Sequence, residues 1–226
     1  MIVTLSPAKL MNFESPPSTQ SQSTPLFSKK AEELIEELGK YSVEEISDLM
    51  DINLKQSFSV YQQIHSFNIG KTKSKQAAFA YNGIAYSGLA IDNFSEQDLN
   101  FAQKHLLILS GLYGVLRPLD MIKPYRLEMQ TKLSNSCGET LYDFWSADLT
   151  KFLNQSLQKD DKIWVNLMST EYTKVINQKL LPENTRIITP NFKEQTANGY
   201  RQVVVHTKKS EGNDGQIHPE KQNNRY

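Results

Sequence analysis

Short apolar runs alternate with amphipathic segments along the whole chain. Ile2–Leu5, Leu106–Leu109 and Ile163–Met168 are runs of the length and composition that form buried strands. Ala31–Leu38 and Leu141–Leu157 instead repeat apolar residues at helical spacing. Strands and helices intermixed around one core predict a single α/β domain of mixed α+β character, with a central mixed sheet flanked by helices.

Capping and turn residues predict the remaining elements. Ser42 with Glu45 and Ser95 with Asp98 have the spacing of capping boxes, and Ser169 is placed to cap a short helix. The predicted helices are 43–50, 54–67, 96–104 and 170–177, the predicted strands are 77–81, 187–193 and 200–206, and 124–127 is expected to be extended. The last two strands are expected to form a hairpin, and the Pro-rich residues 11–27 an irregular loop.

Composition describes a protein without membrane association. A chain of 226 residues can bury a substantial core, and no apolar run approaches the length that spans a bilayer. The first residues, MIVTLSP, are typical of a strand rather than a signal peptide. Cys137 is the only cysteine, which excludes internal disulfides and favours a cytoplasmic location; a peroxide-reactive thiol at this position is the alternative to an incidental one.

Charge and motifs exclude several kinds of site. The chain carries 25 basic and 25 acidic residues, which argues against general coating of nucleic acid but leaves room for a local basic cleft. The four histidines are scattered without metal-ligand spacing, and no phosphate-binding loop, dinucleotide fingerprint or nucleophile elbow is present. The sequence therefore predicts neither a metal nor a cofactor, and it sets no oligomeric state.

Three cations follow the predicted strand 106–109. Arg117, Lys123 and Arg126 lie on a connection stiffened by two prolines. Because ligands of α/β sheets collect at strand ends, these cations predict an anion site. The alternative is structural, with the arginines capping carbonyls or pairing with Asp120 and Glu128.

Polar side chains also follow the other predicted strands. They are Ser6 and Lys9 after the first strand, Tyr81 and Asn82 after 77–81, and Ser169, Glu171, Tyr172 and Lys174 after 163–168. If these strand ends share one edge of the sheet, the side chains form a pocket suited to a phosphate or carboxylate. Solvated lysines and tyrosines packed in the core are the alternative.

The chain resembles the YaaA family of bacterial peroxide-stress proteins. The resemblance rests on SGLYGVLRPLD at 110–120 and PYRLEM at 124–129, with SPAK at 6–9 and matching pieces as far as residue 209. It implies a cytoplasmic stress protein that limits damage by peroxide and unincorporated iron and binds DNA, with any effect on iron being indirect. It also implies a helix-hairpin-helix element around residues 51–53, where Lys55 is the one close cation; an ordinary helical hairpin is the alternative.

Three hypotheses of function follow. The first is binding of double-stranded DNA in a basic cleft, with Lys9, Arg117, Lys123, Arg126 and Lys174 contacting phosphates. The second is an enzyme acting on a small anionic or nucleotide-like substrate, with Lys9 or Tyr172 as the acid–base group. The third is a binding scaffold without catalysis. A closed, ligand-sized cavity would favour a small substrate, whereas an open groove would favour DNA.

The residues after Lys209 differ in character from the rest. Residues 210–226 contain one aliphatic side chain, Ile217, and are expected to form a disordered tail beyond a domain at 1–209. Codons for this tail can be chosen that, read one base later, give KARGMTGKFILKNRITD, which has the Ala-Arg-Gly that the resemblance implies. A frameshift near Lys208 and Lys209 is therefore the hypothesis, and a genuinely divergent tail is the alternative. The lost segment would leave apolar surface exposed.

Overall fold

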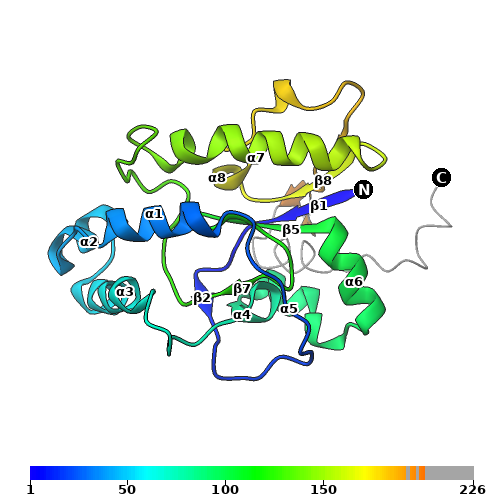
Figure 1. The fold of residues 1–226 in the computed structure, drawn as a ribbon. Coiled ribbons are helices and arrows are strands. Elements are labelled where there is room, and N and C mark those ends of the chain that lie inside the picture. The colour runs from blue at the N-terminus through cyan, green and yellow to red at the C-terminus, as the bar shows by residue number, and fades with distance from the viewer. Residues whose placement is uncertain (192–193, 197–198, 202–226) are drawn as a thin grey trace.

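The computed structural model describes residues 1–191, 194–196 and 199–201. Its centre is a five-stranded sheet in the order β6-β5-β1-β8-β9 (Figure 1). The strands are β1 (Ile2–Leu5), β5 (Leu106–Ser110), β6 (Gly114–Leu116), β8 (Ile163–Leu167) and β9 (Arg186–Ile188). Strands β5, β1, β8 and β9 are parallel, and β6 returns antiparallel to β5. The predicted α/β domain with a mixed sheet is confirmed.

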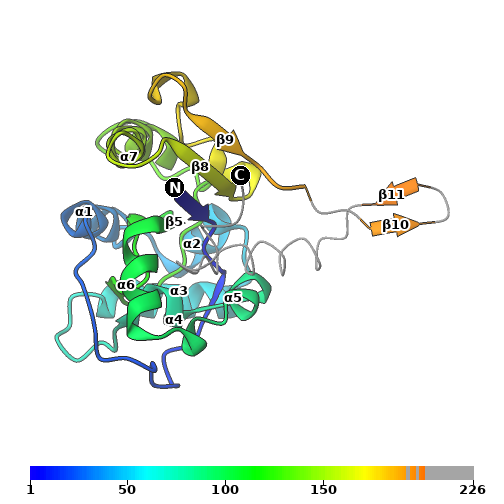
Figure 2. The same ribbon diagram turned by 90° about the vertical axis from the view of Figure 1, so that its right-hand side faces the viewer.

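Burial on both faces explains the apolar strands. All four residues of β1 are buried, and Val3 pairs with both Leu106 and Val165. Parallel strands covered on both sides are continuously apolar because neither face meets water. Figures 1 and 2 place helix α7 (Leu141–Gln158) on the far side of β1 and β5 from α3, α4 and α5. The Trp164 indole is fully buried and donates a hydrogen bond of 2.9 Å to Thr4 Oγ1.

Smaller elements surround the sheet. The other helices are α1 (Ser28–Leu38), α2 (Val43–Met50), α3 (Leu54–Ser66), α4 (Ala77–Ala80), α5 (Ile84–Leu89), α6 (Glu96–His105) and α8 (Thr170–Thr173), with 3-10 turns at Ile91–Asn93 and Gln178–Leu180. The two-stranded pairs are β2 (Leu10–Met11) with β4 (Tyr81–Asn82), β3 (Lys75–Gln76) with β7 (Met121–Ile122), and β10 (Glu194–Thr196) with β11 (Gly199–Arg201). The capping boxes predicted at Ser42 and Ser95 are both formed.

Several predicted elements differ in the structure. The segment 77–81 is the helical turn α4 followed by Tyr81 in β4, because a short apolar run has the same pattern whether it is a buried helix or a buried strand. Residues 124–127 belong to no strand, and β6, which begins inside the expected glycine turn, was not predicted. Ser169 stands at the N-cap of α8, yet its side chain makes no capping hydrogen bond.

The C-terminal hairpin is shifted from its predicted place. The strand expected at 187–193 is β9, which joins the main sheet beside β8, and the hairpin is formed by β10 and β11. In Figure 2 these two strands project away from the sheet. Residues 202–226 lie outside the described residues, so the domain boundary at 209 and the aberrant tail 210–226 stay predictions. Among the described helices, none is both long and apolar enough to cross a membrane.

Candidate functional site

A cleft of about 620 Å³ opens at the carboxyl ends of β1 and β8. The chain passes from β1 to β5 on one side of β1 and later crosses to β8 on the other side, so these two strand ends form the topological switch point of the sheet. Ligands of open α/β sheets bind at this position. The cleft is walled by residues 5–11, by 82–86, by 125–128, and by Leu167, Ser169, Glu171 and Tyr172.

The cleft brings together many of the residues predicted for a site. Ser6, Lys9, Asn82, Arg126, Ser169, Glu171 and Tyr172 all line it. The structure therefore places these side chains on one concave surface.

The charged centre of the cleft is Glu128. Its Oε2 lies 2.8 Å from Lys9 Nζ, and its Oε1 lies 3.3 Å from Arg126 Nη2. The Lys9 side chain is exposed, whereas Arg126 is 24% and Glu128 18% exposed. The Nε atom of Arg126 is buried and has no hydrogen-bond partner among the described residues. Two cations thus share one carboxylate, and one of them has a donor left over.

Glu171 is a second carboxylate in the same cleft. Its Oε1 accepts a hydrogen bond of 3.2 Å from the backbone N–H of Gln130. Burial raises the pKa of Glu171 above its usual value, and the negative charge of Glu128 raises it further, against the lowering effect of that hydrogen bond. A carboxylate in a cleft whose pKa is raised by burial is a candidate to give or take a proton.

Hydrogen bonds between two serines join the chain segments that follow β1 and β8. The Ser6 hydroxyl donates to Ser169 Oγ over 3.3 Å and accepts from the Ser169 backbone N–H over 2.9 Å. The Tyr86 hydroxyl donates to the Ser6 carbonyl over 2.9 Å. These contacts account for the missing cap at α8, because the Ser169 hydroxyl faces Ser6 instead.

Buried tyrosines form the floor of the cleft. Tyr125 Oη lies 2.6 Å from Tyr81 Oη and 2.7 Å from Ser110 Oγ. Burial raises the pKa of Tyr125 to about 12 and also raises the pKa values of Tyr81 and Tyr172, so these hydroxyls stay neutral. Tyr81 supports Tyr125 from behind and does not itself line the cleft. Sequence reasoning missed Tyr125, whose signal was its place between the predicted cations.

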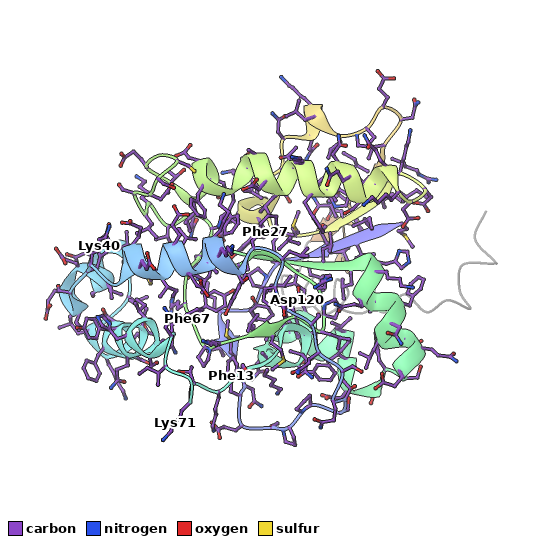
Figure 3. The ribbon with its side chains drawn as sticks, viewed as in Figure 1. Phe13, Phe27, Lys40, Phe67, Lys71 and Asp120 are labelled. Atoms are coloured by element: carbon purple, nitrogen blue, oxygen red, sulfur yellow. The ribbon has the colours of Figure 1, made fainter. Side chains whose placement is uncertain are left out.

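The other predicted cations lie elsewhere. Arg117 pairs with Asp120, at 2.7 Å, and donates to the Thr24 carbonyl; Asp120 lies in the interior in Figure 3. Lys123 Nζ donates to the Phe67 carbonyl and lies 4.8 Å from the centre of that aromatic ring. Neither Arg117 nor Lys123 lines the cleft, and both make the internal contacts of a structural residue.

Two further lysines are exposed outside the cleft. Lys174 follows α8, and Lys55 lies in the first turn of α3. Helices α2 and α3 form a hairpin in which Asp51 is left-handed (φ 50°) and the Asn53 side chain caps α3. The helical hairpin is thus present, and its identity as a DNA-binding helix-hairpin-helix stays a prediction.

The cleft continues into a second hollow of about 600 Å³. The second hollow extends along α3 between Gln56 and Gln63. The residues common to both hollows are Lys9, Leu10, Met11, Asn82, Tyr125 and Arg126. The described residues contain no cluster of His, Cys, Asp and Glu arranged to hold a metal ion, and Cys137 is exposed.

The fold and the cleft define an α/β protein with a ligand-sized site at the switch point of its sheet. The family model described as "Peroxide stress protein YaaA" matches residues 1–217. A UPF0246 protein of Ralstonia pickettii (strain 12J) is 44% identical over 215 residues, covering 94% of this chain and 83% of the relative. A UPF0246 protein of Cellvibrio japonicus (strain Ueda107) is 42% identical over 215 residues with the same coverage. The chain belongs to the YaaA family of peroxide-stress proteins.

Proposed function

We propose that this peroxide-stress protein works by binding a phosphate-bearing ligand in the cleft, with Lys9 and Arg126 as the phosphate contacts. The observation that supports the proposal is that both cations already meet on one anionic group, the Glu128 carboxylate. A phosphate has more acceptor oxygens than a carboxylate, so one phosphate group can take both ion pairs at once.

The walls around these cations favour a nucleotide over a bare anion. Leu10, Ile84 and Leu127 supply apolar surface, and Asn82 supplies a side-chain amide. A cleft of about 620 Å³ lies within the range of small-molecule sites. Within this cleft, Glu171 is the acid–base group for any chemistry on the ligand, since the high pKa of the buried Tyr172 keeps its hydroxyl neutral.

Double-stranded DNA is the second candidate ligand. It is favoured by the hollow that extends the cleft along α3, beside the helical hairpin. Lys9 and Arg126 are nearly balanced in the cleft by Glu128 and Glu171, so duplex binding would release few counterions. With at most two phosphates neutralised, the logarithm of DNA affinity would fall with the logarithm of salt concentration with a slope no steeper than about −2. A mononucleotide would instead saturate a single site.

Titration calorimetry separates these ligands. We expect AMP or a short duplex to bind, and Lys9→Ala and Arg126→Met to weaken that binding about tenfold or more each, equivalent to ~1.4 kcal/mol. Lys174→Ala is the matched control, because it removes an exposed lysine outside the cleft. Glu128→Gln should strengthen binding, because it removes the carboxylate with which the ligand competes.

The outcomes are distinct. Binding of AMP with no binding of duplex selects the nucleotide, and duplex binding without AMP binding selects DNA. Binding that is unchanged in both Lys9→Ala and Arg126→Met would refute the proposal, as would the absence of binding to either ligand.

A further inference from the structure

A separate pocket of about 400 Å³, distinct from the cleft and from the hollow along α3, contains a buried lysine. Lys75 lies in the short strand β3 and is 6% exposed. Its strand pairs with β7, and the next side chain, Gln76, is anchored on the Ser21 carbonyl at 2.9 Å. The backbone around Lys75 is therefore fixed.

The amine of Lys75 has little support for a charge. An ammonium group has three donors, and Nζ makes one hydrogen bond, of 3.0 Å, to the Asn12 carbonyl. Nζ forms no ion pair with any carboxylate in the described part of the chain. Burial lowers the pKa of Lys75, although the negative charge of Asp92 opposes the effect. A larger fraction of this amine is therefore neutral, and so nucleophilic, than of an exposed lysine.

The pocket around this amine is polar and is lined by a carboxylate. Lys75, its acceptor Asn12, and Asp92 all line it, together with the amides of Asn82 and Asn93. A volume of about 400 Å³ admits a small molecule, and the amides can hold hydroxyl or carbonyl oxygens. The pocket shares Asn82 and Tyr86 with the main cleft and is otherwise separate from it.

We propose that Lys75 is a nucleophilic lysine that forms an imine with a small polar aldehyde bound in this pocket. The neutral Nζ adds to the carbonyl carbon, forming a C–N bond, and one proton of the former amine passes through the Asp92 carboxylate to the carbonyl oxygen, which gives a carbinolamine. The second amine proton then passes by the same route to the carbinolamine hydroxyl, the C–O bond breaks with loss of water, and the imine forms. The balance is one amine and one aldehyde giving one imine and one water, so no oxidant or reductant is needed. This site does not depend on the phosphate cleft.

Reductive trapping tests the assignment on the unmodified protein. The full chain is incubated at neutral pH with glycolaldehyde and sodium cyanoborohydride, and the hydroxyethyl group left on each lysine is followed by peptide mass mapping. We expect Lys75 to be modified several-fold faster than the exposed Lys71 and Lys73, of which Lys71 is labelled in Figure 3. The rate at Lys75 should saturate with glycolaldehyde concentration, and its advantage should vanish in guanidinium chloride.

Two readouts on the folded wild-type chain decide the outcome. Labelling of Lys75 in the folded wild-type protein no faster than that of Lys71 would overturn the proposal. A rate that rises linearly without saturation would overturn binding of the aldehyde in the pocket. Both comparisons use the wild-type chain, so neither depends on the folding of a variant.

Discussion

Measurements of stability can distinguish a structural role of Arg117, as the partner of Asp120, from a role in ligand binding. The Asp120 side chain is 0% exposed, and its carboxylate accepts from Arg117 Nη2 at 2.7 Å, from the Arg117 backbone N–H at 2.8 Å and from Ser23 Oγ at 2.7 Å. The Arg117 side chain is 28% exposed. The two partners are therefore unequal, because only the arginine retains access to water.

This difference in exposure determines how much stability each variant is expected to lose. Arg117→Met leaves a fully buried carboxylate without its cation, a change that costs about 3–5 kcal/mol. Asp120→Asn keeps the shape of the side chain and leaves a guanidinium that reaches solvent, so the loss is closer to that of a charged hydrogen bond, about 1.5–3 kcal/mol. For a chain of this size, with about 2–4 °C per kcal/mol, Tm should fall by roughly 6–20 °C for the first variant and roughly 3–12 °C for the second.

Urea unfolding and a thermal melt measure both variants and the double variant. We expect the double variant to be less destabilised than the sum of the single ones, because the second change removes the charge that the first left unpaired. Lys174→Met is the control for loss of an exposed cation and should change stability by no more than about 0.5 kcal/mol. An Arg117→Met variant with wild-type stability and weakened nucleotide or DNA binding would refute the structural role and place Arg117 in the ligand site.

Three further variants test the cleft, its floor and the packing of β6 against Trp145. Glu171→Gln should raise Tm at pH 7 but not at pH 4. Because the pKa of Glu171 is raised in the folded protein, ionisation of the wild-type carboxylate lowers stability increasingly as the pH rises above 4.5, the ordinary pKa of this group. Thermal melts at the two pH values would contradict this if the gain in Tm were the same at both. Tyr125→Phe removes the partner of Ser110 Oγ and should cost about 1–3 kcal/mol in urea unfolding, with an unchanged midpoint as the contrary result. Gly114→Ala should cost about 2–4 kcal/mol, because φ is +71° and a new Cβ would lie 2.6 Å from the Trp145 ring; a neutral effect would mean that the ring can move.

Elements with strong local signals were predictable from the sequence. Strand β1 is buried on both sides and its sequence is uniformly apolar, and the capping boxes at Ser42 and Ser95 are encoded within four residues. Helix α4 was predicted as a strand because Ala77–Ala80 is apolar throughout, and burial alone does not distinguish the two states. Strand β9 was given the wrong partner, since the choice between β8 and a hairpin depends on contacts distant in sequence.

Site residues were predictable where the order of the strands determines their position, and unpredictable where the direction of a side chain on irregular backbone determines it. Strand-end reasoning located Ser6 and Ser169 because the sheet order brings both strand ends together. The same reasoning could not separate Arg126, which enters the cleft, from Arg117, which turns to Asp120, because irregular backbone has no fixed periodicity of side chains. Nor did any sequence pattern mark Lys75 as buried.

Internal compensation in the cleft determines what can bind there. Lys9 and Arg126 already form ion pairs with Glu128, so an entering anion must bind these two cations more strongly than that carboxylate does. A singly charged anion exchanges one acceptor for another and gains little, whereas a dianionic phosphate brings a second negative charge to the two cations. Because the displaced Glu128 then lies near Glu171 without its cations, binding should raise the pKa of Glu171 further. Selectivity for phosphate therefore arises because Lys9 and Arg126 are already paired with Glu128, and not from the number of cations in the cleft.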